Sequence, residues 1–372
     1  MGFLEKFKDL KNIFQTKSLR RTSATGQVGL GIDIGSGFLK IVEVKQVGGV
    51  LELSTYGEVA MGPYEDKVIG ETTSLSDEQL KSSLETALKD ARVTAKNATV
   101  AISSNESLVF TLKLPQVSRN DLKSVVPNEA RKFVPVPITE VSLDWWRVPD
   151  IIQKESERSD TEDDVLVVAI KNQIIDQYNS IFSNTVGGVD IGSVEVETFS
   201  ALRGVMNNEL SPFMLVDFGA RSVRIAVVEY GIVKTFHIIN RGGAFITGAL
   251  VKAFGLDFTA AEQMKREMNI ADKNQETEIV QTNLQYIFTQ IKKTLIDYER
   301  VNNSAINKVI LIGGGSLLNG FRERLTSEIN VEVFSSDPFA KVSTPDFLHD
   351  VLKQSGPEFA IAMGAALRNF ES

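Results

Sequence analysis

The chain of 372 residues contains no cysteine and only two histidines, His237 and His349. The missing cysteines exclude disulfide bonds, thiolate catalysis and cysteine-ligated metal sites. Two isolated histidines, neither with a motif around it, argue against a histidine-centred catalytic triad and against a zinc site built from several histidines. Any chemistry must therefore rest on carboxylates, lysines, backbone amides and a metal ion that prefers oxygen ligands.

Long apolar runs are also missing, because none reaches the roughly 18–20 residues that a bilayer-spanning helix needs. The N-terminus lacks the apolar core and the small-residue cleavage site of a signal peptide. A content of 42% hydrophobic and 24% charged residues is typical of a globular protein, and the length favours two domains. We therefore expect a cytoplasmic protein. The formal net charge of −8 argues against nucleic acid as a partner.

The first 27 residues differ in charge from the rest of the chain. Residues 1–21 contain six basic and two acidic side chains, a balance of +4, so the remainder carries −12. Large apolar side chains recur there at helical spacing, at Phe3, Phe7, Leu10 and Phe14. The pattern predicts a basic amphipathic helix over 1–14 and a linker up to residue 27. Such a helix favours peripheral contact with an anionic membrane; packing on the protein's own body and a disordered tail are the alternatives.

Beyond the linker, short strands and helices alternate, which argues for an α/β protein. In the first half the sequence predicts strands over 28–34, 39–46, 50–60 and 165–170, and helices over 76–92 and 172–184. In the second half it predicts three strands from 213 to 239, a helical region over 242–302, a strand–glycine–helix unit at 308–328 and a last helix over 357–370. The stretch 153–164 is charged and nearly devoid of apolar residues, which indicates a hairpin loop.

One short motif occurs twice. The sequences DIGSGFLKIVEV, from Asp33, and DFGARSVRIAVV, from Asp217, begin 184 residues apart, about half the chain. In each, glycine follows the aspartate by two positions and a basic residue, Lys40 or Arg224, follows it by seven. Two halves built on one strand–turn–strand plan predict a duplicated pair of domains with a cleft between them.

The first copy of the motif suits a cleft that binds polyphosphate. A tight turn at Gly35-Ser36-Gly37 would present several backbone N–H groups to one point, and a side chain at either glycine would block the approach of a phosphate. Ser36 adds a hydroxyl donor and Lys40 a compact positive charge. The alternative is an ordinary hairpin with an Asx turn, which two matching copies disfavour.

An aspartate follows the strand on each side of the predicted cleft. Asp33 and Asp217 could together hold Mg²⁺, and they would do so through bound water, because this ion gives up its hydration reluctantly. The two carboxylates are therefore the predicted metal site.

Two further features suit the nucleoside part of a nucleotide. VILIGGGSLLNGF, at 309–321, predicts a buried strand, three glycines that let the backbone approach a base or sugar, and a helix with Ser316 as N-cap. In FTAAEQMKREM, Glu262 and Lys265 lie one helical turn apart, as a ribose-binding pair would. Because Glu262 also follows Thr259 by three residues, a capping box explains the spacing equally well.

With these motifs in order, the sequence resembles the actin-like ATPase superfamily and, within it, the PilM family of type IV pilus assembly proteins. The resemblance covers nearly all of residues 28–370. DIGSGFLK and DFGARS look like the two phosphate motifs, IGGGSLLNGF like the adenosine motif, AEQMK like the ribose-binding helix and PEFAIAMGAAL like the closing helix. NEARKFVPVPITEVSLDW and EVETFSALR are similar to PilM segments and separate the chain from sugar kinases and chaperone ATPases.

The resemblance implies a duplicated, two-lobed actin-like (ribonuclease H-like) α/β fold with the small subdomain shared by FtsA and PilM. It also implies ATP or ADP, with Mg²⁺, between the lobes. The residues implied at the phosphates or their metal ion are Asp33, Gly35, Ser36, Gly37, Lys40, Asp217, Gly219, Arg221 and Ser222. Those implied at the nucleoside are Glu262, Lys265, Gly313, Gly314 and Gly315.

The same resemblance implies a division of the chain into parts. The core of the first lobe is expected at 28–113, completed by about 196–212 and 340–372. The small subdomain is expected at 114–195. The second lobe is expected to have its core at 213–241 and 304–339 and a helical subdomain at 242–303.

PilM-like proteins act at the cytoplasmic face of the inner membrane, where they bind the N-terminal cytoplasmic peptide of the membrane protein PilN within the pilus assembly complex. The resemblance implies this role here, in a type IV pilus or a related type II secretion system. A filament-forming protein like FtsA or MreB and a small-molecule kinase of the same superfamily are the alternatives. The chain has no FtsA-like anchor helix after GAALRNF and no separate sugar-binding or acid-binding motif, which disfavours both.

One departure concerns catalysis. No polar residue is identifiable that would orient an attacking water; Glu129, Glu195 and Glu197 are candidates only by their neighbourhood, and catalysis needs geometry as well as a carboxylate. We therefore expect ATP hydrolysis to be slow or absent. Arg221 also stands where a small residue is expected in the second phosphate turn.

Overall fold

The structure is a computed structural model that describes residues 27–371 apart from 117, 149–161, 183–185 and 208. The helix predicted over 1–14 lies outside the described residues, and so does most of the loop predicted at 153–164. The predicted end of that loop falls within the described residues and is wrong, because residues 162–164 already belong to a strand.

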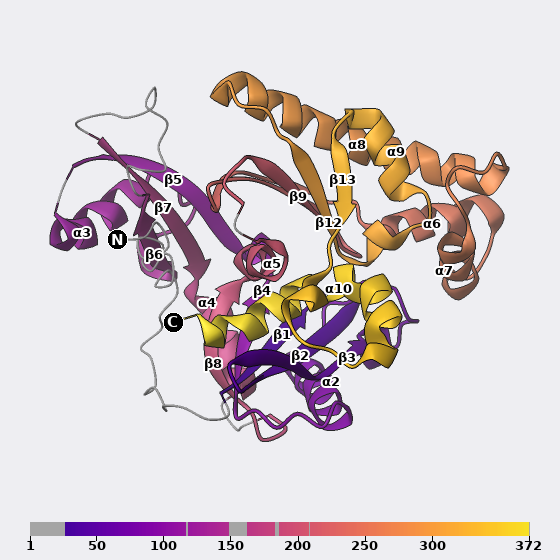
Figure 1. The fold of residues 1–372 in the computed structure, drawn as a ribbon, viewed down its shortest axis with the longest axis horizontal. Helices are drawn as coiled ribbons and strands as arrows, with labels where there is room; N and C mark the ends of the chain where they lie inside the picture. Colours follow the sequence, from indigo (N-terminus) through magenta and orange to yellow (C-terminus); the bar gives the residue numbers. More distant parts are fainter. Residues whose placement is uncertain (1–26, 117, 149–161, 183–185, 208, 372) are drawn as a thin grey trace.

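Two five-stranded sheets share one topology (Figure 1). The first consists of β1 (Val28–Ile34), β2 (Phe38–Val47), β3 (Val50–Ala60), β4 (Asn97–Ile102) and β8 (Asp190–Val196), in the order β3-β2-β1-β4-β8. The second consists of β9 (Phe213–Phe218), β10 (Val223–Glu229), β11 (Ile232–Ile239), β12 (Lys308–Ile312) and β13 (Glu332–Ser335), in the order β11-β10-β9-β12-β13. In each sheet three consecutive antiparallel strands are followed by two parallel ones.

The register of the first hairpin is the same in both sheets. Asp33 on β1 pairs with Lys40 on β2, and Asp217 on β9 pairs with Arg224 on β10. The seven-residue spacing in the sequence thus places an acid beside a base at the same end of each sheet. The topology and the register both agree with the predicted duplication.

A third, smaller sheet consists of β5 (Ser107–Pro115), β6 (Val141–Arg147) and β7 (Glu162–Lys171), in the order β5-β7-β6. One face packs on α3 (Arg119–Ala130), which continues through Pro127. Strands β6 and β7 lie within 114–195, the range expected for the small subdomain, whereas β5 begins before it, at Ser107. β8 also falls within that range but pairs with β4 in the first large sheet.

The other face of the small sheet shares an apolar core with the first large sheet. Leu166 and Val168 of β7 belong to the same buried cluster as Leu84 of α2 (Asp77–Asp90) and Ile181 of α4 (Asn172–Phe182). Both helices lie where the sequence predicts them, and α2 begins with a capping box at Ser76. The small subdomain is therefore packed firmly onto the first lobe.

The predicted helical region of the second lobe consists of three helices: α6 (Gly243–Phe254), α7 (Phe258–Glu267) and α8 (Gln275–Asn302). Together with α9 (Phe321–Ile329) they bury side chains such as Ile246, Leu284 and Phe321 against Val216 and Ile225 of the second sheet. Within the described residues no single helix is both long and apolar enough to cross a bilayer. The pair α6 and α7 meets those criteria only jointly, and it is bent by 112°.

The last long helix, α10 (His349–Leu367), lies between the two large sheets (Figure 1). The sequence predicts that this helix begins at residue 357. The helix instead begins at His349 and continues through Pro357, and the carbonyl of Pro357 accepts a hydrogen bond from Gly313 N at 2.7 Å.

Helix α5 (Glu197–Val205) and helix α10 cross with their backbones almost in contact. A Cβ atom added at Gly364 would lie 1.6 Å from the carbonyl oxygen of Ser200, and one added at Gly204 would lie 2.1 Å from that of Ala360. Both distances are far below any van der Waals contact. The crossing therefore requires glycine at both positions.

Replacing Gly364 by alanine should lower the free energy of unfolding by about 3 kcal/mol or more, because the two helices must separate. Urea denaturation followed by circular dichroism measures the change. Gly248→Ala in α6 is the matched control: nothing lies within 4 Å of the added Cβ, so this variant should gain about 0.5–1 kcal/mol from the better helix former. A Gly364→Ala protein as stable as the wild type would contradict the close crossing.

Candidate functional site

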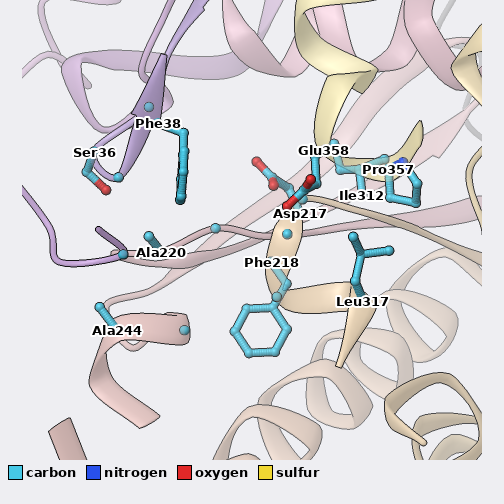
Figure 2. A pocket seen from close by; sticks show the side chains of 18 of the residues that line it. Ser36, Phe38, Asp217, Phe218, Ala220, Ala244, Ile312, Leu317, Pro357 and Glu358 are labelled. Atoms are coloured by element: carbon cyan, nitrogen blue, oxygen red, sulfur yellow. The ribbon is translucent and has the colours of Figure 1, made fainter. Parts of the chain in front are cut away.

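A cavity of the described structure lies between the two lobes (Figure 2). It has a volume of about 330 Å³ and is bordered by the β1–β2 turn, the β9–β10 turn, the beginning of α6, one side of α7 and the glycines after β12. Pro357 and Glu358 of α10 complete its wall. Elements from both repeats and from the helix between them thus enclose one site.

All but two of the residues proposed from the sequence line this cavity. They are Asp33, Gly35, Ser36, Gly37, Lys40, Asp217, Gly219, Glu262, Lys265, Gly313, Gly314 and Gly315. Four segments that are far apart in the sequence therefore meet at one place, as a shared ligand would require.

Arg221 and Ser222 do not line the cavity. The guanidinium of Arg221 donates hydrogen bonds to the carbonyl of Thr73 and, at 3.1 Å, to the hydroxyl of Ser74, so it reaches across to the first lobe. Ser222 is buried, and its carbonyl accepts a hydrogen bond from Gly219 N at 3.0 Å that closes the turn. Since neither residue borders the cavity in this arrangement, the phosphate contacts expected of them stay a prediction.

The glycines of the first turn, which border the cavity, also serve the packing of the protein itself. Gly35 N donates to the carbonyl of Phe38 at 3.0 Å, which closes the turn. A Cβ atom added at Gly37 would lie 3.2 Å from the Cβ of Ala220 in the other lobe. Gly37 therefore lets the two turns approach each other, as Figure 2 shows at the end of the cavity between Ser36 and Ala220.

The triple glycine is required by packing within the protein. Gly313 has φ +81°, and an added Cβ would lie 2.6 Å from Oδ1 of Asp217. At Gly314 it would lie 2.6 Å from Oε1 of Glu358, and at Gly315 2.5 Å from the ring of Phe218. The three glycines thus bring the backbone against the cavity's acidic residues and its aromatic wall.

Ser316 is not the N-cap that the sequence suggested. It lies in a 3₁₀ turn, Gly314–Leu317, and its hydroxyl donates to the carbonyl of Gly313 at 2.6 Å. Helix α9 begins later, with Gly320 as its N-cap.

Three carboxylates face the cavity with raised pKa values. Burial raises the pKa of Asp33 to about 7, although the Lys40 ammonium opposes the change. Burial also raises the pKa of Asp217, against the opposing charge of Arg224, which lies 3.0 Å away. The pKa of Glu358 is raised by burial as well. These acids lack enough compensating positive charge, so the site favours a cation.

Glu197 is the one of the three proposed water-orienting residues that borders the cavity. Its carboxylate forms an ion pair with Arg224, and Oε1 accepts a hydrogen bond from Ser104 N at 2.6 Å. By contrast, Glu195 is buried in an ion-pair cluster with Arg203. The third candidate, Glu129, forms a surface pair with Lys132.

Sequence reasoning missed three charged residues of the wall, Arg224, Arg266 and Glu358. Arg224 had a signal, because it occupies the position of Lys40 in the repeat. Glu358 had none, since only the packing of α10 brings it to the cavity.

Glu262 and Lys265 form a tightly bonded group on α7. Glu262 Oε2 accepts hydrogen bonds from Lys265 Nζ and from Thr247 Oγ1, both at 2.6 Å. Burial alone would raise the pKa of Glu262, but the Lys265 charge and these hydrogen bonds hold it below its ordinary value. The capping-box alternative is wrong: Asp257 is the N-cap of α7 and accepts from Ala260 N at 2.8 Å.

A family model described as type IV pilus assembly protein PilM matches residues 31–370. The chain belongs to the PilM family. Among solved structures, it is similar to a PilM-PilN type IV pilus biogenesis complex, with a TM-score of 0.78 and 23% identity, over 92% of this chain and 98% of that chain. It is also similar to ethanolamine utilization protein EutJ from Carboxydothermus hydrogenoformans, with a TM-score of 0.52 and 14% identity, over 98% of each chain. The predicted actin-like two-lobed fold and the predicted family are confirmed.

The buried acid Asp33 should make the ligand-free protein less stable at high pH. Because its pKa rises from 3.8 to about 7 on folding, the folded protein holds a proton that the unfolded chain releases, and stability falls as the pH rises between these values. Asp33→Asn should therefore stabilise the protein by up to about 4 kcal/mol at pH 8 and by less at pH 5. Urea denaturation at both pH values measures this. The exposed control Glu85→Gln should show no such difference, and an equal gain for Asp33→Asn at both pH values would contradict the raised pKa.

Proposed function

We propose that this PilM-family protein binds ATP or ADP with Mg²⁺ between its lobes and serves as a scaffold of a pilus assembly complex at the inner membrane. The observation that carries the proposal is the convergence of both Asp-x-Gly turns and the triple glycine on one cavity. Paired turns of this kind direct backbone N–H groups toward phosphate oxygens. A volume of about 330 Å³ is within the range of small-molecule sites.

In this arrangement the phosphates would lie between the two turns and the nucleoside between α7 and the triple glycine. Lys40, which borders the cavity beside Asp33, would neutralise phosphate charge. Glu262 would accept hydrogen bonds from ribose hydroxyls, because its carboxylate is ionised and held in place by Lys265 and Thr247. Gly313 to Gly315 would leave room for the sugar and base.

The charges of the cavity suit a bound cation. Its lining residues include five acidic and four basic side chains, so a polyphosphate would meet repulsion there without a metal ion. Among the described residues no cluster of three or more histidine or acidic side chains is arranged to ligate a metal directly. Asp33 and Asp217 would therefore hold Mg²⁺ through water, in keeping with the strong hydration of this ion. When bound, Mg²⁺ would supply the positive charge that offsets the phosphates.

The purified protein should bind ATP with Mg²⁺, as isothermal titration calorimetry measures. Asp217→Ala should weaken the Mg²⁺-dependent part of the binding, because one of the two metal-holding carboxylates is lost. Gly37→Val should abolish binding, because its side chain meets Ala220 and keeps the two turns apart. Asp297→Ala, on the exposed side of α8, is the control and should bind normally. A wild-type protein that binds no nucleotide would refute the proposal.

Hydrolysis should be slow because the available carboxylate is already occupied. Glu197 is paired with Arg224 and accepts from Ser104 N, so both carboxylate oxygens already have partners within the protein. We expect a turnover well below the roughly 10 s⁻¹ median of enzymes, and Glu197→Gln should change it little. Phosphate release by both proteins measures this. A wild-type turnover near the median, lost in Glu197→Gln, would show that this carboxylate is an effective base.

The proposed partner is the N-terminal cytoplasmic peptide of a PilN-like membrane protein. Support comes from the family and from the similarity, over 98% of its length, to a chain of a solved PilM-PilN complex. The proposed location is the cytoplasmic face of the inner membrane, with residues 1–14 as a peripheral contact. The basic side chains of residues 1–21 support this location, because an anionic surface attracts each nearby one by about 1 kcal/mol.

Deleting residues 1–21 should reduce flotation of the protein with anionic liposomes, because the rest of the chain carries −12 and is repelled. Binding of ATP and of an immobilised PilN-type peptide should not change, since both use other parts of the protein. Equal flotation of the full and truncated proteins would mean that recruitment rests on the partner alone.

A further inference from the structure

The chain between β3 and α2 crosses one rim of the cavity. We call residues 61–74 the strap. Both of its ends are tied to the β1–β2 turn: Met61 N donates to the carbonyl of Gly37 at 2.9 Å, and Thr73 donates to that of Ser36 from N at 2.8 Å and from Oγ1 at 2.9 Å. Since Ser36 and Gly37 border the cavity, any displacement of this turn by a ligand is passed to the strap.

The strap is braced internally. Lys67 Nζ donates to Glu65 Oε2 and to the carbonyl of Thr72, each at 2.9 Å. Glu65 Oε2 also accepts from Ser74 N at 3.1 Å, and Lys67 N donates to the carbonyl of Gly62 at 3.0 Å. These bonds link its beginning, middle and end, so the strap moves as one body with the turn that holds it.

Arg221 joins the strap to the second lobe. Its Nη2 donates to the carbonyl of Thr73 and to Ser74 Oγ. The same guanidinium adds to the attraction felt by Glu65, whose pKa is lowered chiefly by the hydrogen bond from Lys67 and next by the one from Ser74 N. The side chain that the sequence assigned to a phosphate thus connects the two lobes.

Two steric contacts lie along the same rim. A Cβ atom added at Gly70 of the strap would lie 3.3 Å from the side chain of Glu262 on α7. At Gly37 it would lie 3.2 Å from Ala220, the residue before Arg221. The strap and its turn therefore rest against two wall elements of the second lobe, and a separation of the lobes would break these contacts.

We propose that the strap and Arg221 form a latch that holds the lobes closed over a bound nucleotide and slows its release. The inference rests on the proposed nucleotide site and adds its regulation. If the lobes separate along this rim, both hydrogen bonds donated by Arg221 must break and Gly70 must move away from Glu262. Because Arg221 is exposed, water competes for its hydrogen bonds, so the latch is weak enough to open reversibly. Its effect is therefore on the lifetime of the bound state.

Release of a fluorescent ATP analogue, measured by stopped flow with Mg²⁺, tests the latch. Arg221→Ala should release the analogue about 3- to 10-fold faster, the effect of losing hydrogen bonds from one charged group, with little change in association rate. Ser74→Ala should change release in the same direction by a smaller factor, and Arg221→Lys should restore it in part. Arg322→Ala is the matched control, an exposed arginine on α9 of the same lobe, and should release at the wild-type rate.

A second measurement reports closure directly. The chain has no cysteine, so spin labels at Glu85→Cys on α2 and Lys252→Cys on α6 report one interlobe distance by pulsed electron paramagnetic resonance. With nucleotide bound, Arg221→Ala should add a population at a different distance from the closed one.

The outcomes separate this inference from the proposed function. If the wild type binds no analogue, the nucleotide site itself fails, and the latch with it. Normal binding, with unchanged release and unchanged distances in Arg221→Ala, overturns the latch alone. Weaker binding in Arg221→Ala, with unaltered distances and no effect of Ser74→Ala, would also overturn it, because Arg221 would then act on the phosphates.

Discussion

The arrangement of both lobes depends on how closely α10 approaches its neighbours. Three glycines face this helix: Gly29 and Gly31 of β1 and Gly204 of α5. A Cβ atom added at any of them would lie between 1.9 and 2.2 Å from a carbonyl oxygen of α10, far closer than van der Waals contact allows. Only glycine, which has no Cβ atom, allows the backbones to pack this closely, and the packing leaves no room for adjustment. The helix is therefore fixed against the first lobe, and its middle brings Pro357 to Gly313 and Glu358 to the cavity. A small-residue helix thus positions one wall of a polar site.

The parts of the fold that the sequence predicts well are those determined by local spacing. The strands and most helices follow from apolar periodicity. A spacing of seven positions from Asp33 to Lys40, and from Asp217 to Arg224, is enough for a tight turn with acid and base paired across a hairpin. Because the motif occurs twice, the sequence also implies that two such turns face one cleft. No long-range contact had to be known for these steps.

The errors come from contacts between segments distant in the sequence. Arg221 resembles a phosphate ligand in its motif, but its acceptors lie almost 150 residues away on the strap. The glycines 313–315 suggest only an approach to a ligand, but they also allow the backbone to pack against Asp217, Phe218 and Glu358. The capping box at Glu262 failed because Asp257 begins the helix earlier and leaves Glu262 to Lys265. In each case tertiary packing outweighs a plausible local motif.

Burial of the acids links occupancy of the cavity to the state of the lobes. Asp33 and Asp217 are almost fully covered, and burial raises the pKa of both carboxylates. The charge of Glu197 adds to both pKa shifts, and that of Asp217 adds to the shift of Asp33. Such a site is unfavourable when empty, since desolvation opposes the charged forms and Lys40 and Arg224 offset only part of the cost. A ligand that brings a cation would relieve this repulsion and favour the closed arrangement, in which the two turns meet at Gly37 and Ala220. For a scaffold, binding alone would then be sufficient to define the closed shape, and rapid turnover would work against it.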